Sequence, residues 1–310
     1  MLWFESLDKK IEEYLPDLAY EKDVPMSQHT SFRIGGPAKR MAFPVNGEQM
    51  VLLIGFAQQS DATVLVIGNG TNLLIADEGL DCLVINTTKM NAVEMPLYDG
   101  IAAEDEVFAM AGATLASVAM YACKQGLSGL EFAHGIPGTV GGAVCMNAGA
   151  YGGEMKDVLK GAAVLFPDEG IRFLSAEELD LSYRHSLLSE RADAVVLYAV
   201  FSLQKGEEET IRESMRELMA RRKKSQPLEY PSAGSTFKRP TGYFAGTLIE
   251  QTGLKGMTVG GAQVSQKHAG FVINTGGATC ADVKNLIAQV QDKVYEASGV
   301  SLEPEVKIIG

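Results

Sequence analysis

Two clusters of glycine constrain this chain more than any other feature of its sequence. The first follows an apolar run and reads Gly68-Asn69-Gly70-Thr71-Asn72; the second covers residues 135–153, GIPGTVGGAVCMNAGAYGG. Glycine permits tight turns and lets the backbone approach a ligand, because it has no Cβ atom. The second cluster also contains Ile, Val, Met and Tyr, so it predicts an ordered loop system and not a flexible linker.

The first cluster departs from a dinucleotide fingerprint. A strand expected over 63–67 enters Gly68-x-Gly70, but the third glycine is missing and LLIADEGLDCLVIN predicts a turn and a strand in place of a helix. A Rossmann unit needs a helix N-terminus for the phosphate, so it is excluded. An ordinary hairpin turn explains this cluster equally well. Together, the two clusters favour backbone loops that hold a diphosphate and a flat ring system.

Composition narrows the class of protein. The length of 310 residues suggests two domains, and the net charge of −12 disfavours nucleic acid or an anionic membrane as a partner. Four cysteines without a C-x-x-C pair predict reduced thiols and no metal site. The N-terminus has no basic region before an apolar core, and no apolar stretch reaches about 18 residues. We therefore expect a cytoplasmic protein with no membrane span.

Hydrophobic periodicity predicts helices and strands along the whole chain. The expected helices are 1–20 (with Leu7, Ile11, Tyr14 and Leu15 at helical spacing, ended near Pro16), 48–59 capped by Asn46, 115–124 ended by Gly126, 207–224, and 282–297 ended by Gly299. The expected strands are 63–67, 82–86, 107–111, 194–203, 270–274 and 306–309. Glutamates open and basic residues close the helix 207–224, which complements its dipole, and Pro227 and Pro231 stop it.

Three polar motifs contain the remaining candidate functional residues. They are Tyr183-Arg184-His185-Ser186, PSAGSTFK at 231–238 and LEPEVK at 302–307. Taken singly, each is better explained as a surface segment or a turn. Their order along the chain is what carries information.

In that order, the motifs resemble the bacterial UDP-N-acetylenolpyruvoylglucosamine reductases, from Thr30 to Ile309. The matching segments are GNGTNLL at 68–74, GIPGTVGGA and NAGAYG within 135–152, YRHS at 183–186, PSAGSTFKRP at 231–240, LKGMTVGGAQVSQKHAGFVIN at 254–274 and LEPEVKIIG at 302–310. Two insertions found in some members are missing here, at 204–206 and after the serine motif at 240–245. The chain therefore resembles the shorter, second type of the family.

The resemblance implies an α+β fold. Residues 1–205 would form a two-lobed FAD-binding domain of the p-cresol methylhydroxylase (vanillyl-alcohol oxidase) type, with an N-terminal helix 1–20 and lobes at about 22–90 and 91–205. Residues 206–310 would form an α+β substrate-binding domain. FAD would be bound non-covalently, NADPH would be the co-substrate, and we expect a monomer. The implied cofactor-binding residues are Gly68, Asn69, Gly70, Thr71, Asn72, Leu73, Pro137, Gly138, Thr139, Gly141, Gly142, Asn147, Gly149, Ala150 and Arg222.

The implied reaction reduces UDP-N-acetylglucosamine enolpyruvate to UDP-N-acetylmuramate for peptidoglycan precursor synthesis. A hydride passes from NADPH to the flavin N5 and then to C3 of the substrate, and C2 takes a proton. Ser235 would donate that proton, which requires a lowered pKa or a relay. Arg184, whose planar fork suits a carboxylate, and a protonated Glu305 would stabilise the enolate.

Residues that bind the rest of the substrate are less sharply defined. The resemblance and side-chain chemistry suggest Tyr151, Tyr183, Lys238, Lys255 and His268. Without the family's long insertion, the tyrosine that clamps the diphosphate would be Tyr151, Tyr183 or Tyr243. The basic run 221–224 is a candidate for phosphate contacts, but a solvated helix end explains it equally well.

Two other functions fit a flavin-binding chain. An oxidase of a sugar or hydroxy acid would be reoxidised by oxygen and would not depend on NADPH. A flavin- or nucleotide-binding sensor would bind the cofactor without turnover, and Ser235→Ala would then not affect reoxidation by substrate.

Overall fold

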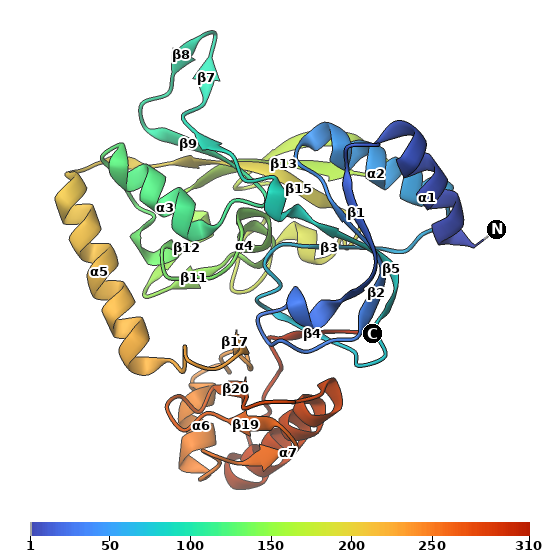
Figure 1. Cartoon of the computed structure of the whole chain (residues 1–310). Helices are drawn as coiled ribbons and strands as arrows, with labels where there is room; N and C mark the ends of the chain where they lie inside the picture. Colours follow the sequence, from blue (N-terminus) through green and yellow to red (C-terminus); the bar gives the residue numbers. More distant parts are fainter. Residues whose placement is uncertain (1) are drawn as a thin grey trace. The chain divides into compact units, whose positions relative to one another are not determined.

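The computed structural model describes residues 2–310, which form two compact units (Figure 1). Unit 1 contains the chain up to Glu21, Arg40–Asn69 and Cys82–Arg221. Unit 2 contains Lys22–Lys39, Gly70–Asp81 and Arg222–Gly310. Two segments from the first third of the sequence therefore belong to the same unit as the C-terminal third.

An antiparallel five-stranded sheet forms the centre of unit 1. Its strand order is β14 (Gly170–Ser175), β13 (Leu159–Phe166), β15 (Val195–Ser202), β9 (Glu106–Met110) and β6 (Val93–Glu94). Ala162 and Val164 of β13 pack into one core with residues of α3 (Leu115–Lys124) and α4 (Val140–Met146). Ala163 and Leu165 pack into another with α1 (Trp3–Tyr14) and α2 (Gly47–Gln59). This alternation of successive residues places helices on both faces of the sheet.

The first glycine cluster follows a strand of a second sheet. This sheet has the order β1 (Ala19–Pro25), β2 (Pro37–Phe43), β5 (Leu80–Asn86) and β3 (Val64–Ile67), with β3 and β5 parallel. After Gly70 comes the short strand β4 (Leu73–Ile75) in place of a helix. The prediction that this segment is not a Rossmann unit is therefore confirmed.

Unit 2 contains a separate four-stranded sheet and its own core. The strand order is β17 (Ser232–Ser235), β20 (Phe271–Asn274), β19 (Ala262–Val264) and β18 (Thr258–Val259). Helices α6 (Ala245–Gln251) and α7 (Cys280–Ser298) contribute to the same core. The terminal strand β21 (Lys307–Ile309) pairs in parallel with β4, so the segment after the first glycine cluster is paired with the end of the chain.

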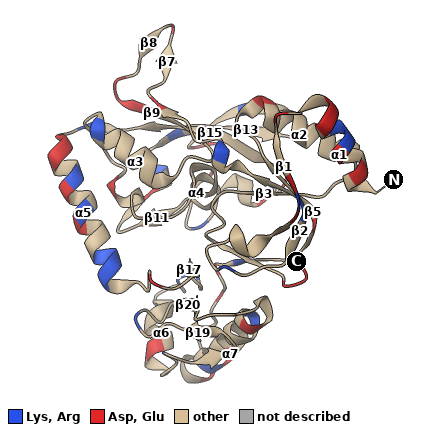
Figure 2. Ribbon diagram, viewed as in Figure 1, with Lys and Arg blue, Asp and Glu red and all other residues tan. Residues whose placement is uncertain are grey.

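The remaining elements are short, apart from one long helix. They are α5 (Glu208–Ser225), β7 (Leu97–Tyr98), β8 (Ile101–Ala102), β10 (Leu127–Ser128), β11 (Gly149–Ala150), β12 (Gly153–Glu154), β16 (Gln204–Lys205) and the 3-10 turns Met26–Gln28, Thr87–Lys89, Glu131–Ala133, Met155–Asp157 and Leu187–Ser189. Figure 2 shows the acidic start and basic end of α5 that the sequence predicts.

Most predicted elements are confirmed. The Asn46 side chain caps α2 by accepting a hydrogen bond from the Gln49 N–H, and Gly299 ends α7 with a φ of 69°. Two predictions are wrong in part. The N-terminal helix ends at Tyr14, near the predicted stop at Pro16 but short of residue 20, and the Tyr14 side chain is exposed. The stretch 135–153 is not all loop. It contains the helix α4 and the hairpin β11–β12.

A buried ion pair holds α1 in unit 1. The Arg40 guanidinium donates two hydrogen bonds of 2.8 Å to the two carboxylate oxygens of Asp8, and the Tyr20 hydroxyl donates another of 2.7 Å to the same carboxylate. The Arg40 side chain is 6% exposed and that of Asp8 is 20% exposed. Burial, and then the hydrogen bond to Asp8, raise the pKa of Tyr20. The carboxylate is therefore the common partner of both groups.

Asp8→Asn should strongly destabilise the protein, because it removes the negative charge that the buried Arg40 guanidinium binds through two hydrogen bonds. We expect the free energy of unfolding to fall by about 3 kcal/mol. Urea unfolding measures it, with Asp17→Asn, a change at an exposed carboxylate, as the control. Equal midpoints for the two variants would contradict the structural role of this pair.

Candidate active site

Arg184 lies in a tight turn of unit 1. Ser182 and His185 exchange two backbone hydrogen bonds of 3.1 Å, which close a turn around Tyr183 and Arg184. Arg184 has a φ of 55°, in the left-handed region that non-glycine residues seldom adopt. Its guanidinium carbon lies 5.2 Å from the centre of the Tyr183 ring. A strained backbone conformation at a charged residue is typical of a functional site.

Ser235 and Glu305 are close together in unit 2, although 70 residues separate them along the chain. The Glu305 N–H donates a 2.8 Å hydrogen bond to the carbonyl of Thr236, and Phe237 and Pro304 form an antiparallel bridge. Ser235 is exposed and Glu305 is half-buried. The structure therefore brings two of the three predicted catalytic residues together on adjacent backbone segments, and Arg184 belongs to the other unit.

The first glycine cluster is divided between the two units. In unit 1, a Cβ atom on Gly68 would lie 2.0 Å from the Thr139 Oγ1, and the Asn69 amide donates a 2.9 Å hydrogen bond to the Pro137 carbonyl. These contacts require a glycine at 68 and hold the two predicted cofactor loops against each other. Close backbone approach of this kind fits a cradle for a diphosphate.

Residues 70–73 belong to unit 2 and contact the segments that carry Ser235 and Glu305. Gly70 has a φ of 60°, and a Cβ there would lie 2.1 Å from the His29 carbonyl oxygen. The Asn72 amide donates a 3.1 Å hydrogen bond to the Glu305 carbonyl. Ser31, which the sequence analysis missed as a site residue, donates a 2.6 Å hydrogen bond to the carbonyl of Ser232 on β17. Ser31 directly follows Thr30, where the family resemblance begins, and this was the available signal.

Some backbone N–H groups of the second glycine cluster already donate hydrogen bonds within the protein. The Val140 and Gly141 N–H groups donate to the carbonyls of Ala113 and Ala111, so they support the loop and are not available to a phosphate. Gly142, by contrast, faces open space, since an added Cβ would meet only Thr139 at 3.8 Å. The loop thus combines a rigid base with a bare backbone surface, which fits a flat cofactor.

The side chain of Asn147, a predicted cofactor-binding residue, is bonded within the protein. It has no exposed surface, and the oxygen and nitrogen of its amide both have protein partners. Its side chain therefore holds the backbone and side chains of neighbouring segments together. Glu154, one of those partners, was missed by the sequence analysis, because nothing local in the sequence links it to Arg184.

The predicted substrate residues have varied surroundings. Tyr151 lies 4.9 Å from the Arg221 guanidinium carbon, whereas Lys238 pairs with Glu303 and Lys255 with Glu250. All three candidate clamp tyrosines are exposed, Tyr151 by 38%, Tyr183 by 52% and Tyr243 by 49%. The two lysines would have to exchange carboxylate partners for phosphate, and exposed ion pairs of this kind are weak enough to allow it.

Two histidines near the motifs are shifted toward the neutral form. Burial lowers the pKa of His134, which precedes the GIPG segment, and that of His268. The His268 Nδ1 accepts a 3.2 Å hydrogen bond from the Gly270 N–H, so the proton of the neutral ring is on Nε2. The His134 Nδ1 is buried and has no hydrogen-bond partner among residues 2–310. Neither ring adds a fixed positive charge near neutral pH.

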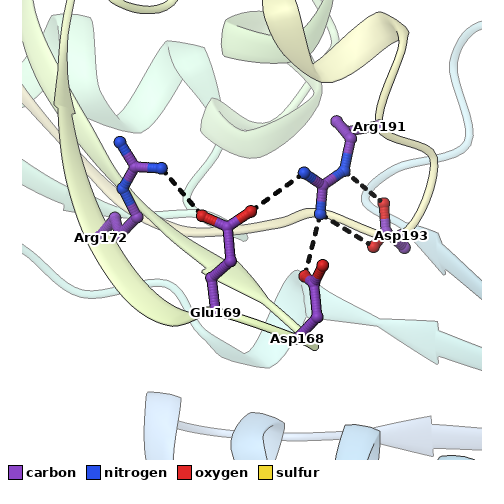
Figure 3. A network of polar contacts seen from close by, with 5 residues as sticks. All are labelled: Asp168, Glu169, Arg172, Arg191 and Asp193. Atoms are coloured by element: carbon purple, nitrogen blue, oxygen red, sulfur yellow. Dashed lines mark hydrogen bonds and ion pairs between the residues drawn. The ribbon is translucent and has the colours of Figure 1, made fainter.

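The loop that follows Arg184 is fastened at its far end by a surface ion network (Figure 3). Arg191 contacts Asp193, Glu169 and Asp168, and Glu169 also binds Arg172. Arg172, followed by Arg191, lowers the pKa of Glu169. This network connects residues 191–193 to the turn between β13 and β14.

Comparisons with known proteins define the class. Residues 38–175 match the family model of the FAD-binding domain, and residues 226–309 match that of the UDP-N-acetylenolpyruvoylglucosamine reductase C-terminal domain. A glucooligosaccharide oxidase from Acremonium strictum shares the fold at a TM-score of 0.50 and 14% identity, over 96% of this chain and 60% of that one. The chain is thus a flavoprotein oxidoreductase with FAD as cofactor, and its α+β fold is of the vanillyl-alcohol oxidase type, as predicted.

Closer relatives identify the family. A UDP-N-acetylenolpyruvoylglucosamine reductase from Agathobacter rectalis is 52% identical over 97% of this chain and 98% of its own length, and one from Caldanaerobacter subterraneus is 48% identical over 99% of each. The crystal structure of the reductase from Thermus caldophilus matches with a TM-score of 0.79 and 35% identity, over 94% of this chain and all of that one. The chain belongs to the UDP-N-acetylenolpyruvoylglucosamine reductase family, whose co-substrate is NADPH.

The described residues include neither a membrane-spanning helix nor a cluster of metal-ligating side chains. From residue 2 onward, no helix has the length and apolar character needed to span a membrane. Within the same part of the chain, no group of three or more His, Cys, Asp or Glu side chains is arranged to hold a metal ion. All four cysteines are thiols.

Glycine should suit position 184 better than alanine, since the backbone there has a φ of 55°. Both substitutions remove the guanidinium, so their difference reports the backbone alone. We expect Arg184→Gly to be more stable than Arg184→Ala by about 1 kcal/mol in urea unfolding. An alanine variant as stable as the glycine variant would mean that the turn is not left-handed in solution.

Proposed function

We propose that this chain catalyses the NADPH-dependent reduction of UDP-N-acetylglucosamine enolpyruvate to UDP-N-acetylmuramate, a cytoplasmic step of peptidoglycan precursor synthesis. Relatives at 52% and 48% identity bear the name of this reductase. The observation that supports the proposal most is the pairing of the Ser235 and Glu305 segments through the Glu305 N–H and the Thr236 carbonyl. The exposed Ser235 and the half-buried Glu305 therefore lie on adjacent segments, and a hydroxyl and a carboxyl can protonate and stabilise a carbanion.

In this proposal, Ser235 delivers the proton to C2 of the substrate. A serine hydroxyl is a weak acid in water, so it can serve only where charge on C2 develops within hydrogen-bonding reach. Ser235 lies at the end of β17, with its neighbour Thr236 fixed on both sides: the Thr236 N–H donates to Gly270 and its carbonyl accepts from Glu305. This rigid backbone supports a precisely oriented donor.

Arg184 and Glu305 would stabilise the enolate that forms when C3 receives hydride. Negative charge then spreads onto the substrate carboxylate, and a guanidinium can bind both its oxygens. Glu305 in its protonated form would donate a further hydrogen bond to the same group. Groups fixed where charge develops stabilise the transition state more than the ground state.

FAD, when bound, supplies the hydride carrier between NADPH and the substrate. We propose that residues 68–73 and 137–142, with Gly149, Ala150 and Arg222, hold it without a covalent link. In sequence, residues 1–205 would form the FAD-binding domain and 206–310 the substrate-binding domain, with Arg222, Tyr151 and Tyr183 serving the ligand of the other domain. Tyr183, Tyr151, Lys238, Lys255 and His268 remain candidates for the rest of the substrate, and the monomeric state stays a prediction.

Ser235→Ala should affect only the second half of the reaction. With protein reduced anaerobically by NADPH, addition of the enolpyruvyl substrate should restore oxidised flavin absorbance about 10³-fold more slowly than in the parent protein. Reduction by NADPH should be nearly unchanged, because no proton to C2 is involved.

Ser232→Ala is the matched control, since it removes a hydroxyl from the same strand. It should leave both half-reactions close to those of the parent. An equal loss in both half-reactions for Ser235→Ala would make the serine structural. Rapid reoxidation by oxygen, with no response to the UDP-sugar, would favour a sugar oxidase instead.

A further inference from the structure

Asn147 is a fully buried amide that bonds to three residues from two separate segments of unit 1. Its nitrogen donates to the Glu154 Oε2 at 2.8 Å and to the Ser182 carbonyl at 3.0 Å. Its oxygen accepts a 3.0 Å hydrogen bond from the Lys156 N–H. Burial of a polar side chain is costly unless its hydrogen bonds are made, and here both N–H donors and the acceptor are engaged.

Two of these partners, Ser182 and Glu154, flank turns that expose candidate substrate residues. Ser182 closes the turn that presents Tyr183 and Arg184. Glu154 lies on β12, which pairs with β11 as a hairpin whose tip is Tyr151 and Gly152. One amide therefore connects the Arg184 turn to the Tyr151 hairpin, although residues 154 and 182 are far apart in the sequence.

Both turns have conformations that need support. Tyr151 and Arg184 each have a φ of 55°, and Asn147 itself has a φ of 42°. Non-glycine residues persist in this region only when their surroundings hold them there. A second contact reinforces the Arg184 turn from the same helix end, because the Ser186 hydroxyl donates a 2.8 Å hydrogen bond to the Cys145 carbonyl.

We propose that Asn147 is a positioning residue that fixes the Arg184 guanidinium for the substrate step. This inference rests on the role proposed for Arg184. An amide is the side chain suited to the position, since it supplies two donors and one acceptor at one point. A carboxylate has no donor, and an apolar group has neither. Glu154 contributes by accepting a hydrogen bond from the Asn147 amide, and the same bond fixes the Tyr151 hairpin.

The test separates positioning from simple stability. Asn147→Asp replaces the donors with a carboxylate that faces both Glu154 and the Ser182 carbonyl, which repel it. Adding Glu154→Gln restores a donor between positions 147 and 154 but does not restore the donor that position 147 supplies to the Ser182 carbonyl. The double variant should therefore recover most of the stability lost in Asn147→Asp, as measured by urea unfolding.

The substrate step should not recover with the stability. In both variants, flavin reoxidation by the enolpyruvyl substrate should be about 10- to 100-fold slower than in the parent, as expected for a misplaced catalytic group. In steady state kcat should fall more than KM rises, and reduction by NADPH should stay within about two-fold. Ser186→Ala, a milder change at the same turn, should slow the substrate step in the same selective way.

Three results would overturn the proposal. The first is that the double variant recovers the substrate step together with its stability. The second is that the Asn147 variants lose both half-reactions equally, and the third is that Ser186→Ala and the double variant both leave the substrate step unaffected. Arg184→Ala, measured in parallel, tests the underlying function separately. If it does not slow the substrate step, the role of Arg184 fails; if it does and the Asn147 variants do not, only the positioning role fails.

Discussion

The amide of Asn147 has no contact with water, so each of its hydrogen bonds must be made within the protein. Those bonds go to Ser182, Glu154 and Lys156, which lie in a turn, a hairpin strand and the segment after it. A buried polar group with one satisfied arrangement specifies a single geometry for everything attached to it. The candidate site in unit 1 depends on this constraint, because both of its exposed turns are attached.

Unit 2 contains a similar arrangement, in which the side chain of Asn72 holds the backbone. The Asn72 amide bonds to the Glu305 carbonyl, and the Glu305 N–H bonds to Thr236, beside Ser235. In both units, then, an asparagine in a glycine-rich segment fixes the backbone of a proposed catalytic residue. Reactive side chains on turns need such support, since a turn by itself has few hydrogen bonds to hold its conformation.

Local patterns in the sequence predicted the regular elements well. Helices α2, α5 and α7 have clear apolar faces and end signals, and the failure of GNGTNLL to continue into a helix was evident from the residues alone. Helix α4 was missed, because glycines lower helix propensity and hide the period. It forms where Ala111 and Ala113 accept hydrogen bonds from its first residues, which is tertiary support that no local pattern contains.

The sequence supplies candidate residues for the site but not the contacts that hold them in place. Motif order, through family resemblance, indicated Arg184, Ser235 and Glu305, and the structure pairs the segments of the last two. It could not reveal that the Asn147 amide bonds to Ser182, since that contact joins residues 35 apart. Nor could it reveal that Lys238 and Lys255 have carboxylate partners, because surface ion pairs leave no periodic signal.

A double-mutant cycle between Asn147 and Arg184 tests this account most directly. The quantity to measure is the rate constant for flavin reoxidation by the enolpyruvyl substrate in Asn147→Asp, Arg184→Ala and the variant with both changes. If Asn147 acts through Arg184, the combined variant should match Arg184→Ala within about two-fold, since the group being positioned is already gone. Effects that multiply independently would show that Asn147 serves the reaction by another route, and would contradict the account.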